Sequence, residues 1–169
     1  AGGYYKRSRN SYDEKVKSDP LFKGVKVITA DVPPTMPFTK PATQDLVVTF
    51  RNLHNWLGQD AMKAVMQEAY NSLKEGGHFG VVEHRAPEGS DLEFMKKSGY
   101  VTQSLAIKTA KEVGFKLVAS SEINANPKDT ADHPRGVWTL PPSFRLKDQD
   151  RAKYAAIGES DRMTLLFKK

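Results

Sequence analysis

The chain of 169 residues contains no cysteine. Disulfide-stapled folds and metal sites built from thiolates are therefore excluded. Long apolar runs are also missing, since the two longest, residues 45–50 and 163–167, are far shorter than the ~20 residues that a membrane-spanning helix needs. A chain of this length can still bury a core of its own, because folding hides roughly 70% of the surface that the unfolded form exposes. We expect a soluble protein without a membrane segment.

Concentrated positive charge is lacking as well. Lysine and arginine together number 26 against 20 acidic residues, which gives a net charge of +6. The basic residues are nevertheless spread along the chain, and only residues 6–9 and 168–169 form dense clusters. Surfaces that bind nucleic acids usually carry a continuous basic stripe with stacking aromatic side chains. The charge pattern therefore argues against nucleic acid as the main partner.

The hydrophobic periodicity predicts strands that alternate with helices. Continuous apolar or β-branched runs indicate strands, and apolar residues at spacings of three and four indicate helices that pack one face on a sheet. The expected strands are residues 25–30, 45–50, 79–83, 115–119 and 162–168, and the expected helices are residues 4–17, residues 62–73 and a segment between a Thr102 cap and Gly114. This order predicts an α/β fold with a three-layer sheet.

Residues 124–158 break this pattern. They are rich in proline, aspartate and glycine, with a few aromatic residues such as Trp138. A connection of this length inside a compact domain is usually functional. We therefore expect it to pack across the sheet edge as a lid or a substrate wall, within a single domain that covers residues 1–169. A mobile surface loop is the alternative.

The ends of the expected strands carry the polar residues from which a site could be built. Ligands of open α/β sheets bind outside the carboxyl ends of the strands. Asp31 follows the first strand, residues 50–56 follow the second, and residues 83–85 end the third. Together they would form a polar pocket with an aromatic wall. Each also has a structural interpretation: Asp31 as a turn residue, His54 or His84 as a hydrogen-bonded core histidine, and the arginines as ion-pair partners.

Signatures of metal and nucleophilic catalysis are missing. The four histidines include no pair at the helical i, i+4 spacing, so we expect no metal site. Neither a Gly-x-Ser-x-Gly elbow nor a phosphate-binding P-loop occurs in the chain. The candidates for acid–base chemistry are His54 and His84, because an unperturbed imidazole titrates near pH ~6.5.

Several stretches resemble one enzyme family. Residues 45–56 end in Phe-Arg-Asn-Leu-His-Asn-Trp, and residues 73–85 run from a Leu-Lys-Glu-Gly-Gly turn to Val-Val-Glu-His-Arg. Both are similar to the second half of class I S-adenosylmethionine-dependent methyltransferases. The tail at residues 121–130, 136–142 and 157–164 resembles a bacterial group of predicted methyltransferases. The resemblance spans nearly the whole chain. It implies a Rossmann-like sheet with an antiparallel last strand, S-adenosylmethionine as the cofactor and methyl transfer to a small-molecule substrate.

The resemblance also exposes a gap. Such methyltransferases begin with a strand, a glycine-rich cofactor loop and a second strand that ends in an acidic residue, and no part of this chain matches them. In the family these two strands lie between the strands expected at residues 25–30 and 45–50, so their loss would leave an apolar sheet edge open. The first residue is alanine, not methionine. We therefore expect a C-terminal fragment, or a sheet completed by a missing N-terminal segment or by a second copy in a homo-oligomer.

The resemblance implies roles for the residues at the strand ends. It places Asp31 near the adenine of the cofactor. The methionine part of the cofactor would lie beside Phe50, Arg51 and Asn52, the substrate beside Asn55, Trp56, Arg85 and Trp138, and the proton acceptor would be His54 or His84. A sulfonium methyl is already activated, so the protein must align the acceptor, exclude water and, for a protonated nucleophile, take up the proton.

Two other functions fit parts of the sequence. A methyltransferase-like domain that binds a ligand or partner without catalysis would explain the missing glycine-rich loop. An NAD-dependent oxidoreductase has less support, because its Gly-x-Gly-x-x-Gly loop is also missing. The supply of the cofactor favours a cytoplasmic location, and the absence of cysteine suits either the cytoplasm or an oxidising space such as the periplasm.

Overall fold

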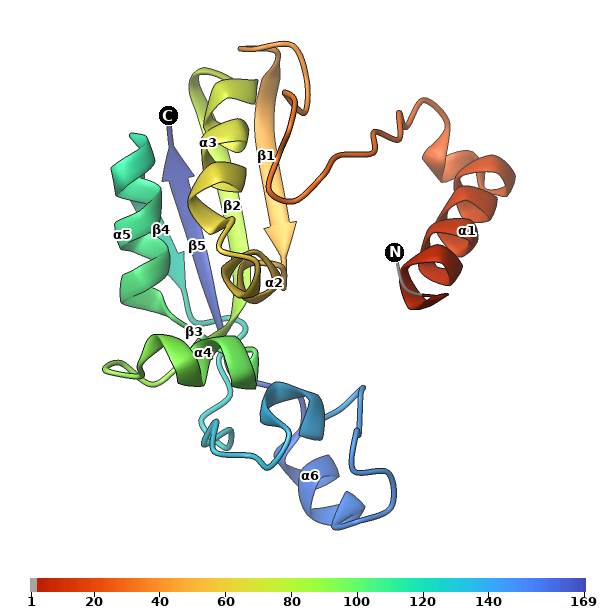
Figure 1. The fold of residues 1–169 in the computed structure, drawn as a ribbon, viewed down its shortest axis with the longest axis vertical. Helices are drawn as coiled ribbons and strands as arrows, with labels where there is room; N and C mark the ends of the chain where they lie inside the picture. Colours follow the sequence, from red (N-terminus) through yellow and green to blue (C-terminus); the bar gives the residue numbers. More distant parts are fainter. Residues whose placement is uncertain (1–2) are drawn as a thin grey trace.

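A mixed β-sheet lies at the centre of the chain in the computed structural model, which describes residues 3–169 (Figure 1). Its strands are β1 (Gln44–Phe50), β2 (Leu73–Ala86), β3 (Val101–Thr102), β4 (Lys116–Ser121) and β5 (Arg162–Lys168). The order is β1-β2-β5-β4, and β3 pairs with the end of β2. β1 runs parallel to β2, whereas β5 runs antiparallel to β2 and β4. The expected Rossmann-like sheet with an antiparallel last strand is confirmed.

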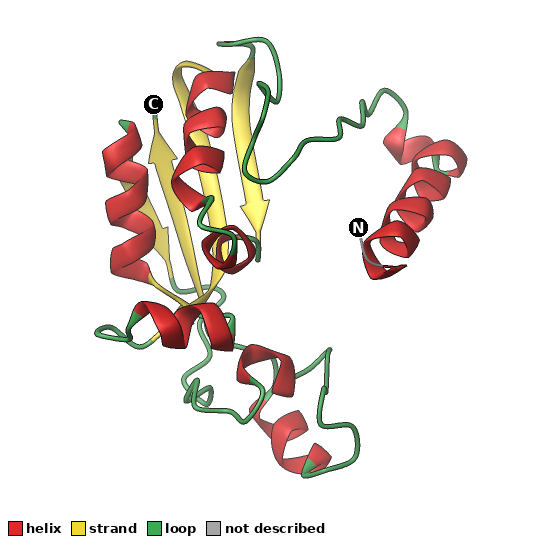
Figure 2. Ribbon diagram, in the orientation of Figure 1, coloured by secondary structure: helices red, strands yellow, loops and turns green. Residues whose placement is uncertain are grey.

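Helices α3 and α5 cover one face of this sheet (Figure 2). The α-helices are α1 (Gly3–Ser18), α2 (Leu53–Gly58), α3 (Met62–Ser72), α4 (Leu92–Ser98), α5 (Gln103–Val113) and α6 (Arg151–Ile157), and the 3-10 helices are η1 (Pro20–Phe22) and η2 (Gly136–Thr139). The side chain of Thr102 accepts a hydrogen bond from the backbone N–H of Leu105, and α5 ends at Gly114, whose φ is 116°. Both ends of this helix are as the sequence predicts.

The covered face packs its apolar side chains against these helices. Alternation along β2 and β5 buries Phe79, Val81, Leu165 and Phe167. The rings of Phe79 and Phe115 stack with their centroids 5.2 Å apart, and the ring of Phe167 lies 6.2 Å from that of Phe79. Each large apolar side chain that is buried in this way contributes roughly 1.5–3 kcal/mol. This core holds the strands whose ends form the site.

The opposite face of the sheet is open. Leu46, Val48 and Phe50 alternate along β1 with inward-facing residues and are 56%, 50% and 59% exposed, and Val118 on β4 is 49% exposed. In the part of the chain that the structure describes, β1 pairs only with β2. The described residues thus form the sheet and the helices on one face, and none of them forms the first two strands of the family's sheet, as the sequence predicts.

The predicted strand at residues 25–30 is wrong. This segment has no regular structure, and Val27 and Ile28 are 38% and 57% exposed. A β-branched run becomes a strand only when neighbouring strands satisfy its backbone groups, and no other described segment pairs with it. Asp31 therefore follows an extended linker and not a strand end.

Several elements differ in extent from the prediction. The strand predicted at residues 79–83 is part of the longer β2. The helices α2 and α4 each have only six or seven residues, too few to show a periodicity in the sequence. Residues 124–158 contain η2 and α6 between irregular stretches. No helix of the described chain combines the length and the apolar character that crossing a membrane requires.

Candidate active site

A cleft opens where the carboxyl ends of β1 and β2 meet the beginning of β5. Its volume is about 330 Å³. The predicted site residues in its lining are Phe50, Arg51, Asn52, His54, His84 and Trp138. The other residues that line it are Val137, Pro141, Pro142, Ser143, Glu159, Ser160 and Arg162. The parallel pair of strands ends at this edge, which is the position where open α/β sheets bind ligands.

A buried carboxylate holds His54, which lies in the first turn of α2. Nδ1 of His54 is 3.0 Å from Oε1 of Glu83, and the side chains of the pair are 8% and 0% exposed. The backbone N–H groups of His54 and His84 donate to the same carboxylate at 3.2 and 2.8 Å. This convergence of N–H donors is the hydrogen-bonding pattern of an ionised carboxylate, which only accepts. The proton of the neutral His54 ring is therefore assigned to Nδ1, and Nε2 keeps the lone pair.

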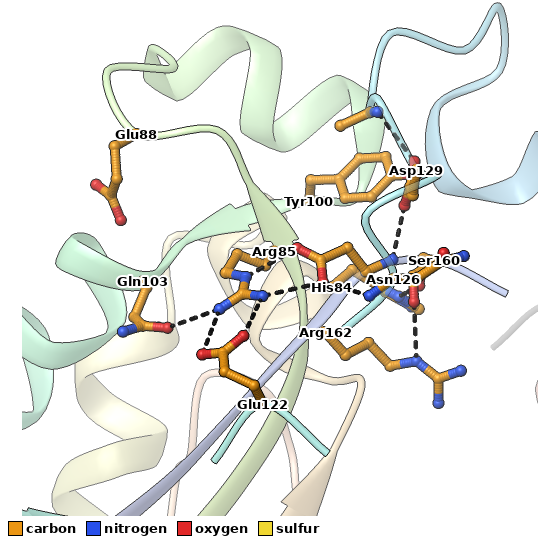
Figure 3. A network of polar contacts seen from close by, with 12 residues as sticks. His84, Arg85, Glu88, Tyr100, Gln103, Glu122, Asn126, Asp129, Ser160 and Arg162 are labelled. Carbon is orange, nitrogen blue, oxygen red and sulfur yellow. Dashed lines mark hydrogen bonds and ion pairs between the residues drawn. The ribbon is translucent and has the colours of Figure 1, made fainter. Parts of the chain in front are cut away.

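His84 lies beside His54, and its ring centroid is 5.4 Å from that of His54. Nδ1 of His84 is 2.5 Å from Oγ of Ser160, a contact between β2 and the segment before β5 (Figure 3). Burial, which is the largest cause, and the neighbouring groups His54, Arg162 and Arg51 together lower the pKa of His84 to about 3. His84 is therefore neutral near pH 7 and a poor proton acceptor.

Two arginines bring positive charge to this cleft. Arg51 directly follows β1, and its backbone N–H donates to the carbonyl of Val82 at 2.7 Å. Its φ of 58° turns the chain out of the strand toward α2. Arg162 begins β5 and forms an ion pair with Glu159. Burial lowers the pKa of Arg162, and the nearby charge of Arg51 adds to this effect.

One side of the cleft comes from residues 137–143. The ring of Trp138 lies 5.9 Å from that of His54 at an interplanar angle of 74°. The guanidinium of Arg145 lies over the Trp138 ring, 4.6 Å from its centroid, in cation–π geometry. Gly136 has a φ of 55°, and a Cβ at this position would collide with the backbone of Ser98. Only glycine lets the chain approach α4 closely enough to place Trp138 at the cleft.

Arg85, which the sequence suggests for substrate binding, is engaged elsewhere. Its guanidinium donates to Asp161 at 2.8 and 3.0 Å and to Glu122 at 2.7 and 3.0 Å (Figure 3). These hydrogen bonds raise the pKa of Arg85 and lower that of Glu122. The side chain therefore links the end of β2 to Glu122, which follows β4, and to Asp161, which precedes β5. Arg85 is not among the residues that line the cleft.

Three further predicted residues lie outside the lining. Asp31 accepts a hydrogen bond from Thr35 at 2.8 Å within the extended linker. Trp56 packs partly buried against the core from α2. Asn55 is exposed on the same helix and faces a neighbouring hollow that also includes Ser143 and Trp138. The structure thus brings six of the predicted residues together at the cleft, but not Asp31, Asn55, Trp56 or Arg85.

The sequence reasoning placed Glu83 at a strand end but gave it no role, and it missed Ser160 and Arg162. Glu83 offered a signal, because a charged residue inside an otherwise apolar strand is buried only when it is paired. Ser160 and Arg162 lie in the tail at residues 157–164, which carries part of the family resemblance. Their positions beside His84 depend on the pairing of β5 with β2, which no local pattern reveals.

The same residues could offer ligands to a metal ion. One atom each from His54, Glu83 and His84 lie within 4.8 Å of one another. The histidine spacing did not reveal this group, because α2 supplies one member and β2 the other two. Two features oppose a bound cation: Glu83 already accepts its hydrogen bonds from both histidine residues, and the charges of Arg51 and Arg162 act on His84. The absence of a metal stays a prediction.

Comparisons with known proteins bear on the fold. No family model matches the chain, and no curated protein matches it. Solved structures do. The cyclase SpnF superposes with a TM-score of 0.60 at 15% identity, over 93% of this chain and 60% of that one. A Galdieria sulphuraria protein named as a sarcosine dimethylglycine methyltransferase gives 0.59 at 16% identity, over 95% and 64%.

A larger share of a third structure superposes on this chain. The S-adenosylmethionine-dependent methyltransferase from Mesorhizobium loti superposes with a TM-score of 0.51 at 14% identity, over 92% of this chain and 77% of that one. The chain spans less than two thirds of the first two structures. Identities of this size speak for the fold alone. Together with the strand order, they show that the chain has the fold of class I S-adenosylmethionine-dependent methyltransferases.

Proposed function

We propose that the chain takes part in methyl transfer from S-adenosylmethionine to a small-molecule acceptor, with His54 as the proton acceptor. The observation that carries this proposal is the pair of His54 and Glu83 at the carboxyl ends of the parallel strands, with Nε2 of His54 free of any partner among the described residues. The shared fold supports the reaction class. A base held by a buried carboxylate supports an acceptor with a protonated oxygen or nitrogen.

The residues at the end of β1 fit the cofactor. S-adenosylmethionine supplies a methyl group on a positively charged sulfur. Phe50 is 59% exposed at the mouth of the cleft, and an aromatic face beside a sulfonium contributes about 0.5–2 kcal/mol. The amide of Asn52 offers hydrogen bonds to the polar methionine part. We retain Phe50, Arg51 and Asn52 as candidate cofactor-binding residues, and we no longer include Asp31.

The chain's own residues would perform three tasks. Nε2 of His54 takes the proton of the acceptor, and the resulting positive charge is stabilised by Glu83 at Nδ1. His84 and Ser160 form a neutral polar wall that can orient the acceptor. The segment 124–158, through Trp138, limits the access of water on the remaining side, and so acts as a substrate wall. Alignment of acceptor and methyl group accounts for the rest of the acceleration.

Replacement of His54 by alanine in the full-length protein tests this role. If His54 is the base, turnover falls roughly 10²–10⁴-fold while cofactor affinity changes little. The assay follows transfer of a labelled methyl group to a panel of phenols and hydroxy acids. The matched control is His78→Asn, which changes a histidine of β2 that lies outside the cleft lining, opposite the last residue of β5. A variant that loses melting temperature but keeps the turnover of its folded fraction would identify a structural histidine instead.

Two related proposals concern what lies beyond these residues. The open edge of β1 and its apolar face would be covered by an N-terminal segment of the same protein or by a second copy. A non-catalytic binding domain with this fold is the second candidate function, and a full-length protein that lacks a glycine-rich cofactor loop, as these 169 residues do, would favour it. Cofactor binding without methyl transfer to any acceptor would decide for the second candidate. The cytoplasm remains the proposed location, because the cofactor is made there.

A further inference from the structure

The cleft beside His54 carries an excess of positive charge that methyl transfer does not need. Arg51 and Arg162 both line it, and Glu159 is the only carboxylate among its described lining residues. A methyl group that leaves a sulfonium carries positive character, so cations near its path bring no advantage to the reaction itself. Glu159 balances one of these charges, and the exposed Arg51 has no carboxylate partner among the described residues.

The donors of these arginines are largely unused. Arg51 is exposed, and its guanidinium has no hydrogen-bond or ion-pair partner among the described residues, to which it is bonded through its backbone N–H. Arg162 gives one nitrogen to Glu159, and its Nε donates weakly to the Ser160 carbonyl at 3.4 Å. Glu159 is 52% exposed in this pair, so the pair is screened by water and contributes little. Most of the donor capacity of both side chains points to an external acceptor.

We propose that Arg51 and Arg162 form a subsite for a carboxylate, and that this carboxylate belongs to the methyl acceptor. A guanidinium presents two parallel N–H donors that match the two oxygens of a carboxylate. The hydroxyl groups of Ser143 and Ser160 in the same lining can complete its hydrogen bonds. The proposal rests on the proposed function, because it takes the molecule in the cleft to be the acceptor.

The electrostatics of the neighbouring side chains agree with this reading. The charges of Arg162 and Arg51 contribute to the low pKa of His84, so both cations act on the interior of the cleft. The neutral ring of His84 then adds no positive charge of its own. An anion bound between the arginines would lie next to His84, whose ring is adjacent to that of His54 at 5.4 Å between centroids. A hydroxy acid can thus place its carboxylate at the arginines and its hydroxyl at the base.

The cofactor also carries a carboxylate, on its methionine part, and the position of the arginines separates the two sources. Arg51 directly follows β1, on the side of the sheet where the methionine part is proposed to lie. Arg162 begins β5, beyond β2 and beside Ser160 and His84. A carboxylate that contacts Arg162 as well as Arg51 therefore extends from the cofactor side to Ser160 and His84, which assigns it to the acceptor.

Binding of 4-hydroxybenzoate, measured by calorimetry on the full-length protein without cofactor, tests the subsite. The neutral isostere 4-hydroxybenzamide is the matched ligand. We expect the acid to bind more tightly than the amide, and Arg51→Gln and Arg162→Gln each to weaken the acid about 10- to 100-fold, the range of a charge-assisted hydrogen bond. Glu159→Gln should strengthen binding of the acid, because it removes the carboxylate that pairs with Arg162. Arg135→Gln, an exposed arginine outside the cleft, is the control.

Each outcome separates the possibilities. Equal binding of acid and amide, or binding that is insensitive to both arginine variants, overturns the subsite. If the two variants weaken S-adenosylhomocysteine by the same factor and leave 4-hydroxybenzoate unchanged, the carboxylate is the cofactor's and the assignment to the acceptor is overturned. If the acid binds through the arginines but no acceptor is ever methylated, the subsite stands and the proposed methyl transfer fails.

Discussion

Replacing Glu83 by glutamine should disable the base without removing its side chain. Glu83 is fully buried and takes hydrogen bonds from Nδ1 of His54 and from the backbone N–H groups of His54 and His84. Glutamine has the same shape but only one acceptor oxygen. If that oxygen takes the place of Oε1, the N–H groups at 3.0 and 2.8 Å keep their acceptor, and the N–H of His54 at 3.2 Å faces an amide NH₂.

The structure sets the size of the effect. One buried donor left without an acceptor costs about 1–3 kcal/mol, so the variant should fold with a lower melting temperature. The larger change concerns His54. Without the negative charge, the Nδ1–H tautomer is held less strongly and the imidazolium that forms during the reaction has no counter-charge, so turnover should fall roughly 10²–10⁴-fold. Nitrogen NMR of the His54 ring should show a proton on Nδ1 in the parent protein and a mixture of tautomers in the variant.

The control for this variant is Glu112→Gln. Glu112 lies on α5 and pairs with Lys63 at 3.1 Å on the surface, so its loss should cost about 0–1 kcal/mol and leave turnover unchanged. If Glu83→Gln keeps its turnover within about threefold and His54 keeps its tautomer, the carboxylate does not act through His54. The reasoning about the base would then be refuted, because it depends on this contact alone.

Two further predictions concern stability. The pKa of His84 in the folded protein is about 3, below the ordinary 6.5, so as the pH falls the unfolded chain binds a proton before the folded one does. This contribution to the free energy of unfolding is therefore complete above about pH 6.5 and decreases toward pH 3, by about 2 kcal/mol at pH 5. His84→Asn should flatten this part of the urea-denaturation profile, and an unchanged profile would contradict the burial argument. Thr49 has a buried hydroxyl without a hydrogen-bond partner among the described residues. Thr49→Val should therefore raise the free energy of unfolding by about 1–2 kcal/mol, and a lower denaturation midpoint would show that the hydroxyl is bonded.

The sequence determined the elements whose signals are local. The apolar run that became β1, the helical spacing of α3, and the threonine and glycine that bound α5 each act within a few residues, so their positions were predicted nearly to the residue. The site followed in part from the same logic. His54 and His84 come directly after or at the end of predicted strands, and parallel strands bring their carboxyl ends to one edge.

Tertiary structure decided everything that depends on distant partners. The segment at residues 25–30 has the composition of a strand, but its backbone groups find no neighbour among the described residues, so it stays extended. Arg85 is drawn to Asp161, which lies 76 residues away in the chain. Glu83 became the support of His54 across 29 residues. Local sequence encodes propensity and periodicity, whereas the pairing of charges depends on which strand lies beside which, and that is fixed only when the whole sheet packs.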